Sequence, residues 1–215
     1  MSQVFVDISV SLDGFVAGPD QSLSEPLGKG GEQLHEWVFP LAAWREPHGE
    51  SGGETNASSE VVQESQERAS AVVMGRRMFS GGEGPWSEDP NADAWWGDDP
   101  PFHVPVFVVT HHAREPETKQ GGTTFTFVTE GVEAAVEQAR AVAGERDVHI
   151  AGGASVIQQA LRAGLIDEVR LNVAPVLLGG GARLLDDLGD EPPALELGRV
   201  LAGPAATHLQ YRVLR

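Results

Sequence analysis

Two adjacent arginines follow a run of apolar residues in "VVMGRRMFSGG", residues 72–82. The apolar part has the character of a buried strand, and Gly75 ends it just before Arg76 and Arg77. Paired guanidinium groups can bind phosphate or carboxylate through charge-assisted hydrogen bonds. A solvated turn, in which the arginines only keep the surface soluble, is the alternative. The stretch therefore predicts either an anion site at a strand end or a plain surface turn.

A second candidate for anion binding lies in "HIAGGASVIQQAL", residues 149–161. A strand-like run ends in Gly152 and Gly153 and passes directly into a helical pattern. Bare backbone N–H groups at a helix N-terminus favour a negative charge, and so does the helix dipole. The spacing differs from the G-x-G-x-x-G dinucleotide fingerprint, and paired glycines also occur in ordinary turns. By itself the segment predicts a phosphate cradle or a turn.

A third strand end, "VVTHH", places Thr110 and His111 after an apolar run. Ligands of open α/β sheets bind in the crevice beyond the carboxyl ends of the strands, so we expect the three strand ends to share one rim. Amides for a diphosphate, together with arginines for a separate phosphate, match NADPH, whose 2′-phosphate the arginines would bind. The three motifs together favour this interpretation over three unrelated turns.

Composition limits the other functions that the chain can have. Its 215 residues carry 15 Lys and Arg against 32 Asp and Glu, a formal net charge of -17. Such a surface repels nucleic acid and anionic membranes. The chain has no cysteine, which excludes disulfides, thiolate metal sites and a cysteine nucleophile. We expect a small-molecule substrate and no bound metal. No basic and apolar leader opens the chain, and no apolar run approaches the ~18 residues of a membrane span, so we expect a cytoplasmic protein.

Hydrophobic periodicity predicts the elements that would position these motifs. Strands are expected at residues 3–10, 72–75, 104–110, 123–129, 147–153, 167–181, 194–203 and 206–214. Helices are expected at residues 30–45 with an interruption at Pro40, at 60–69 after a cap at Ser58 or Ser59, at 131–143 and at 154–164. The early alternation of strand and helix predicts one α/β domain over residues 1–215, with a mostly parallel sheet and an antiparallel C-terminal edge.

Two polar segments, residues 46–58 and 80–102, interrupt this pattern as loop insertions. The second is acidic and contains Trp86, Trp95 and Trp96. Three tryptophans in one loop predict either an interface or pocket lid, or a small core beneath the loop, and the sequence favours neither. The tryptophans and the acidic surface suggest apolar area hidden in a subunit contact, so we expect a homodimer.

Several motifs together resemble a known family. In this order, "MGRRMF", "VFVVTHH", "HIAGGASVIQQAL" and "DEVRLNVAPVLLGGGARLL" look like the dihydrofolate reductase-like superfamily, and more closely like the reductase domain of bacterial riboflavin biosynthesis deaminase-reductases. "SVSLDGFVAG" and "THLQYRV" belong to the same pattern, so the resemblance covers nearly the whole chain. It implies an eight-stranded sheet flanked by four helices, NADPH as hydride donor and often a homodimer. The deaminase zinc motif needs cysteine, and this chain has none, so the resemblance implies a standalone reductase-like domain.

The resemblance also implies which residues contact the cofactor. The phosphates would be held by Gly75, Arg76 and Arg77, the pyrophosphate by Gly152, Gly153, Ala154, Ser155 and Val156, the adenosine side by Thr110 and His111, and the nicotinamide side by Ala17 and Gly18.

Two acids are candidates for catalysis. Asp13, in "SLDG", matches an acidic position near the reacting centre in the riboflavin branch, and would deliver a proton or polarise the substrate. Dihydrofolate reductases proper place an acid on the helix before the "MGR" strand, a position that corresponds here to Ser59, with Glu60 beside it. Glu60 could serve in its place, or it is an ordinary acid in the first turn of a helix.

The expected function is therefore an NADPH-dependent reductase that transfers a hydride to a small heterocycle, such as a pterin or a ribosylaminopyrimidine. One alternative is an NADPH-binding module without turnover, which the missing acid at Ser59 would suit. A true dihydrofolate reductase is the other alternative, and it requires Glu60 to face the pocket.

Overall fold

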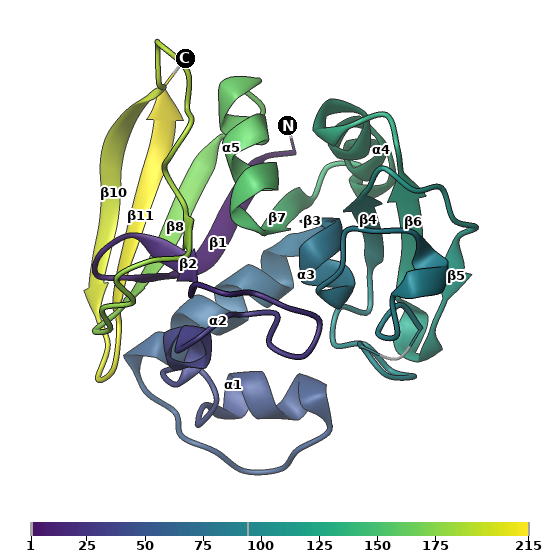
Figure 1. Ribbon diagram of the computed structural model, residues 1–215. Coiled ribbons are helices and arrows are strands. Elements are labelled where there is room, and N and C mark those ends of the chain that lie inside the picture. The colour runs from purple at the N-terminus through teal and green to yellow at the C-terminus, as the bar shows by residue number, and fades with distance from the viewer. Residues whose placement is uncertain (1, 94, 215) are drawn as a thin grey trace.

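The computed structural model describes residues 2–93 and 95–214, which form a large sheet with helices on both faces (Figure 1). The strands are β1 (Val4–Ser11), β2 (Phe15–Ala17), β3 (Ala69–Gly75), β4 (Pro105–Val109), β5 (Glu117–Thr118), β6 (Thr124–Val128), β7 (Asp147–Gly152), β8 (Glu168–Ala174), β9 (Ala182–Arg183), β10 (Ala194–Ala202) and β11 (Thr207–Leu214). The α-helices are α1 (Ala42–Arg45), α2 (Ala57–Arg68), α3 (Arg76–Ser80), α4 (Val132–Ala143) and α5 (Ala154–Arg162). Over the described ranges, none of the helices is long and apolar enough to cross a membrane.

The main sheet confirms the predicted α/β class and contains nine strands in the order β10-β11-β8-β1-β7-β3-β4-β6-β5. The run from β8 to β6 is parallel throughout, so these strands end at a common edge. β11 is antiparallel to both β8 and β10, which gives the expected antiparallel C-terminal edge. The ninth strand is the short β5, which pairs antiparallel with β6. The segment that leads into it is polar and has no apolar alternation, so the sequence pattern does not predict this strand. β2 and β9 form a separate two-stranded ribbon.

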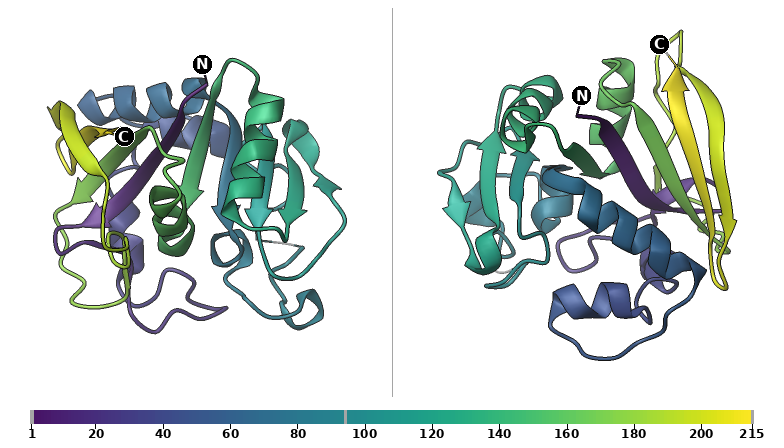
Figure 2. Two further views of the ribbon diagram at one scale, coloured as in Figure 1. Left: turned by 90° about the horizontal axis from the view of Figure 1, so that it is seen from above. Right: turned by 180° about the vertical axis from the view of Figure 1, so that it is seen from behind.

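The main core lies between the sheet and the helices α4 and α5, and α2 covers the opposite face (Figure 2). Val136 on α4 and Ile157 on α5 are buried against Val6, Val73 and Ile150 of the central strands. The helical spacing of the apolar residues in residues 131–143 produces this buried stripe, as predicted.

The start of α2 differs from the prediction. Asn56 is the N-cap, and its side chain accepts a hydrogen bond from the Ser58 backbone N–H at 2.9 Å. The Ser59 hydroxyl in turn accepts from the Asn56 N–H at 3.0 Å, which completes a capping box. Ser58 and Ser59 therefore lie inside the first turn and are buried, where sequence alone suggested that one of them was the cap.

The predicted helix over residues 30–45 is only partly formed. A 3-10 turn at Gly31–His35 and the four-residue α1 flank Pro40, which cannot donate the hydrogen bond that a continuous helix needs. The Pro40 carbonyl instead accepts from Glu54 N–H at 2.8 Å, so the polar loop folds back onto this segment.

The tryptophan-rich loop forms a small core of its own. The Trp86 ring lies 4.9 Å from the Phe127 ring, and the Trp96 ring lies 4.8 Å from the Phe102 ring. Both tryptophans pack against the buried faces of β3, β4 and β6, whereas Trp95 is exposed. For Trp86 and Trp96, the small-core alternative is the correct one.

Candidate cofactor and substrate site

The three motifs that follow apolar strands meet at one edge of the sheet. In the strand register, Gly75 on β3 lies beside Val109 on β4, and Met74 lies beside Gly152 on β7. Thr110 follows directly after β4. Because these strands are parallel neighbours, the shared rim expected from the sequence is present.

Two glycines shape this rim in different ways. A Cβ on Gly75 would lie 2.9 Å from Val156 Cγ2, so only glycine lets the first turn of α5 pack against β3. A Cβ on Gly153 would meet no heavy atom of the described chain within 4 Å, and its backbone φ is -75°, which any residue can adopt. Gly153 therefore faces open space.

The N-terminus of α5 begins at this open space. Gly153 is the N-cap residue and provides no side-chain hydrogen bond to the first turn of the helix. The first amides of α5, at Ala154 and Ser155, thus lie where a phosphate could accept from them. This open cradle fits the pyrophosphate of a dinucleotide.

The two arginines after β3 have different environments. The Arg76 side chain is 6% exposed, and its guanidinium donates to Asp89 Oδ2 at 2.5 Å and to Ser80 Oγ. It also lies 3.7 Å from the centroid of the Trp86 ring. This burial is at odds with the predicted contact between the Arg76 side chain and a phosphate, because the tryptophan-rich loop supplies a carboxylate that occupies the guanidinium.

Burial alone would raise the pKa of Asp89, but hydrogen bonds from Ser80 and Arg76 outweigh it and hold this pKa below its ordinary value. Asp89 is therefore an ionised partner for Arg76. Thirteen residues separate the pair in the sequence, and no local pattern connects them.

Arg77 is the arginine of the pair that reaches the surface. Its side chain is 55% exposed, and its Nε lies 2.6 Å from Glu83 Oε1, which is itself exposed. An exposed pair of this kind is worth little in water, so Arg77 can exchange Glu83 for a phosphate.

The remaining residues predicted to contact the cofactor differ in burial. Thr110 is buried, and its hydroxyl accepts from the His112 N–H at 3.1 Å, whereas His111 is exposed. Ala17 is buried in the β2 strand. A Cβ on Gly18 would lie 2.0 Å from the Lys29 carbonyl oxygen, so glycine is required by the close approach of the two chain segments.

Asp13 ties two loops together. Its carboxylate accepts from the Ser11 hydroxyl at 2.6 Å and from the Gly179 and Leu178 N–H groups at 2.7 and 3.1 Å. These hydrogen bonds, that of Ser11 first, lower its pKa from 3.8 to about 2. A carboxylate this acidic has no proton to deliver at neutral pH, so the geometry argues against the predicted role as proton donor.

The pKa of Asp13 has a direct test. Because the folded-state pKa is depressed, its stabilising contribution is complete above 3.8 and is lost as the pH falls through about 2. An NMR titration of the Asp13 carboxyl carbon is expected to give a value of about 2. An ordinary or raised pKa would contradict these hydrogen bonds to the Asp13 carboxylate and restore Asp13 as a candidate acid.

Glu60 lies on the side of α2 that faces the antiparallel edge. Its Oε2 is 3.3 Å from a guanidinium nitrogen of Arg199 on β10, and both side chains are substantially exposed. The neighbouring Ser59 is used in the capping box. This placement agrees with an ordinary first-turn acid rather than a catalytic one.

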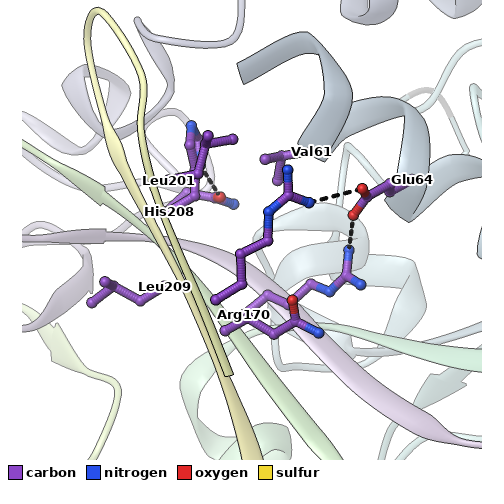
Figure 3. A pocket seen from close by; sticks show the side chains of 9 residues that line it. Val61, Glu64, Arg170, Leu201, His208 and Leu209 are labelled. Atoms are coloured by element: carbon purple, nitrogen blue, oxygen red, sulfur yellow. Dashed lines mark hydrogen bonds and ion pairs between the residues drawn. The ribbon is translucent and has the colours of Figure 1, made fainter. Parts of the chain in front are cut away.

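Two hollows near these residues differ in size. The first lies between α2 and the strands β8, β10 and β11, where Glu64 contacts both Arg170 at 3.4 Å and Arg199 at 2.9 Å (Figure 3). Its volume of about 20 Å³ holds about one water molecule. Sequence analysis missed this polar contact, because the three residues lie far apart in the chain.

The second hollow has the size of a ligand site. Its volume is about 310 Å³, and its walls come from the loop after β2 and from the segment that follows α3. Its lining includes Ser22, Leu23, Arg77, Glu83 and Glu88. A cavity of this order can hold part of a ligand, and Arg77, one of the residues predicted to hold a cofactor phosphate, lies in its wall.

Comparisons with known proteins agree with the fold. A putative riboflavin biosynthesis protein from Shewanella sp. PV-4 is 22% identical, with a TM-score of 0.65 and 100% of both chains covered. A diaminohydroxyphosphoribosylaminopyrimidine deaminase/5-amino-6-(5-phosphoribosylamino)uracil reductase from Thermotoga maritima is 16% identical, with a TM-score of 0.56, 99% of this chain covered and 57% of that one. A pyrimidine reductase-like protein from Corynebacterium diphtheriae is 13% identical, with a TM-score of 0.55 and coverage of 100% and 92%. At these identities the likeness shows the fold. No curated protein sequence matches the chain.

The family is shown by a further match. The profile described as the RibD C-terminal domain matches residues 2–209, nearly the whole chain. This confirms the resemblance to the reductase domain of riboflavin biosynthesis deaminase-reductases. The chain belongs to the RibD C-terminal domain family.

Proposed function

We propose that this protein is an NADPH-dependent reductase of a small heterocyclic substrate of the pyrimidine class. The observation that carries the proposal is the open cradle at Gly153, where a helix begins after β7 and beside the end of β3 without a side-chain cap. Membership of a reductase family supports the same conclusion.

The cofactor would be held by groups from three strand ends. The amides of Ala154 and Ser155 at the start of α5 would bind the pyrophosphate, Arg77 would bind the 2′-phosphate, and His111 would lie on the adenosine side. NADPH supplies the hydride when it is bound, and the protein supplies position and electrostatics. The loop that contains Gly18 would close the nicotinamide side, since β9 and residues 27–29 hold it in place.

Arg77→Ala is expected to weaken NADPH binding by ~1.5–3 kcal/mol while NADH binding stays constant, because only NADPH carries the 2′-phosphate. Calorimetric titration of both cofactors measures this difference. Glu83→Gln is the matched opposite variant, since it releases Arg77 from its partner and should strengthen NADPH binding. Equal affinity of the wild-type protein for the two cofactors would exclude the assignment of Arg77.

The hollow of about 310 Å³ beside Arg77 would take the 2′-phosphate end of the cofactor. The substrate would instead lie against the nicotinamide, on the side of the loop that contains Gly18, because the hydride passes directly from the nicotinamide to the substrate. Neither Asp13 nor Glu60 is placed to donate a proton, so water would supply it.

Two alternatives from the sequence now differ in support. A true dihydrofolate reductase requires Glu60 in the pocket, and its contact with Arg199 disfavours that activity. An NADPH-binding module without turnover is favoured by Ser59. This serine stands where dihydrofolate reductases carry an acid, and it serves to cap α2.

The decisive experiment offers the protein NADPH with three substrates in turn. These are a phosphoribosylaminopyrimidine, the same compound without phosphate, and dihydrofolate, and oxidation of NADPH is followed by absorbance. Turnover of one or both pyrimidines, and not of dihydrofolate, is the expected result. NADPH binding without any turnover would favour the binding module, and failure to bind NADPH would reject both.

A further inference from the structure

The segment that follows β4 is fixed on both sides of His111. The Thr110 N–H donates to the Val128 carbonyl at 3.0 Å, which continues the pairing of β4 with β6 by one residue. The His112 N–H donates to the Thr110 hydroxyl at 3.1 Å. His111 lies between these two residues. Its side chain is exposed and, within the part of the chain that the structure describes, makes no hydrogen bond or ion pair. The backbone is thus held in place while the imidazole stays available to a ligand.

Trp86 supplies the contact that fixes the far side of His111. Its indole N–H donates to the His112 carbonyl at 2.9 Å. The two residues lie 26 positions apart in the chain, so the tryptophan-rich loop reaches across to the segment after β4. The Thr110 hydroxyl is 3.5 Å from the same carbonyl, at the limit of a hydrogen bond, which leaves Trp86 as its main donor.

The indole itself has little freedom to move. The Arg76 and Arg114 guanidinium groups lie over its ring, 3.7 and 5.1 Å from the ring centroid. Phe79 and Phe127 meet the ring edge to face, with centroids 5.9 and 4.9 Å away. Both kinds of contact are attractive. Four side chains therefore hold the ring, and Trp86 presents a fixed N–H donor rather than a surface on which a ligand could stack.

Arg114 fastens the end of the same segment. Its guanidinium donates to the Ala92 carbonyl at 3.0 Å and to Asp93 Oδ1 at 2.6 Å, both in the tryptophan-rich loop. Residues 110–114 are consequently attached to that loop at two points, and His111 lies within the attached segment.

We propose that Trp86 is a positioning residue that holds His111 in place for the adenosine half of the cofactor. The inference rests on the proposed function, because it takes a nicotinamide dinucleotide as the ligand. An exposed imidazole can stack on an adenine ring or form a hydrogen bond with it. A segment that is already ordered loses less conformational entropy when a ligand binds, so Trp86 raises the affinity without touching the ligand. Since Arg77 would bind the 2′-phosphate, the effect of Trp86 is the same for NADPH and NADH.

The test compares Trp86→Phe with Trp95→Phe by calorimetric titration of NADPH, NADH, 2′,5′-ADP and reduced nicotinamide mononucleotide. Trp86→Phe keeps an aromatic ring but removes the indole N–H. Trp95 lies in the same loop and is 42% exposed, so Trp95→Phe controls for the exchange of residue type.

Trp86→Phe is expected to weaken the binding of NADPH, NADH and 2′,5′-ADP by one common factor, roughly three- to tenfold, the usual effect of losing one hydrogen bond. Reduced nicotinamide mononucleotide has no adenosine, and its affinity should stay at the wild-type value. Trp95→Phe should bind all four ligands as the wild type does. Equal losses for 2′,5′-ADP and reduced nicotinamide mononucleotide would show a merely structural role and overturn the proposal, and so would no loss at all.

His111→Ala completes a double-mutant cycle with Trp86→Phe. Because Trp86 acts through His111, each single variant should bind 2′,5′-ADP more weakly, and the double variant should lose no more than the larger of the two single losses. Additive losses would contradict a shared role.

A measurement on the wild-type protein covers the case in which Trp86→Phe does not fold. The NMR signal of the Trp86 indole N–H is expected to shift when 2′,5′-ADP is added and to stay in place with reduced nicotinamide mononucleotide. The reverse response, or none, would overturn the proposal. A wild-type protein that binds no NADPH would reject the proposed function, whereas failure of this inference alone leaves wild-type binding intact.

Discussion

Asp89→Ala is expected to destabilise the protein by ~3–5 kcal/mol, because it leaves the Arg76 guanidinium buried without its counter-charge. Arg76 and Asp89 are both almost fully buried, and their contact joins α3 to the tryptophan-rich loop. Ser80 shares the same carboxylate oxygen at 2.5 Å, so a second hydrogen bond is lost as well. Unfolding in denaturant, followed by fluorescence of the tryptophans, measures the loss.

Glu83→Ala is the matched control for this prediction. It removes the carboxylate partner of the neighbouring Arg77, but that pair is exposed and should contribute less than ~1 kcal/mol. Equal effects of the two variants would show that the Arg76 pair is not structural.

The double variant Arg76→Met/Asp89→Leu separates stability from cofactor binding. It replaces a buried ion pair by apolar side chains, an exchange that often leaves stability unchanged or raises it. We expect it to keep the preference for NADPH over NADH, since Arg77 carries that preference. Loss of the preference in a folded double variant would return Arg76 to the phosphate site.

Gly153→Ala is expected to weaken NADPH binding more than tenfold, or more than ~1.4 kcal/mol, with little loss of stability. The new methyl group would enter the open space in front of the first amides of α5, where the pyrophosphate is expected. It meets no clash and no unfavourable φ in the protein itself. Thermal melts with and without NADPH measure both effects, and a ligand-induced rise in Tm equal to that of wild type would exclude a phosphate cradle at Gly153.

Gly152→Ala should behave in the opposite way. The φ of Gly152 is 126°, a backbone conformation that residues other than glycine rarely adopt. A Cβ there would also lie 3.3 Å from Ile8 Cδ1 in the core. We therefore expect a lower Tm without ligand, which distinguishes a backbone requirement at Gly152 from a ligand requirement at Gly153.

The sequence alone determined the class of the fold and the common rim. Apolar runs that end in Gly75 and Gly152 predicted two buried strands, and helical spacing in residues 131–143 predicted α4. These features follow from local periodicity, which reflects the burial of one face of each element. Parallel connections then require the strand ends to share an edge, so the rim could be predicted before any contact was known.

Only the tertiary structure decided what each polar side chain at the rim does. Arg76 and Arg77 are adjacent and identical in type. Arg76 is nevertheless buried in an ion pair with Asp89, whereas Arg77 pairs with Glu83 at the surface. The resemblance implies that Asp13 is a catalytic acid, but hydrogen bonds from the nearby Ser11 hydroxyl and from the distant backbone amides of Gly179 and Leu178 lower its pKa and keep it ionised. The pKa and availability of a charged group depend also on neighbours that lie far away in the chain, such as Gly179 for Asp13 and Asp89 for Arg76, and local sequence patterns do not encode those neighbours.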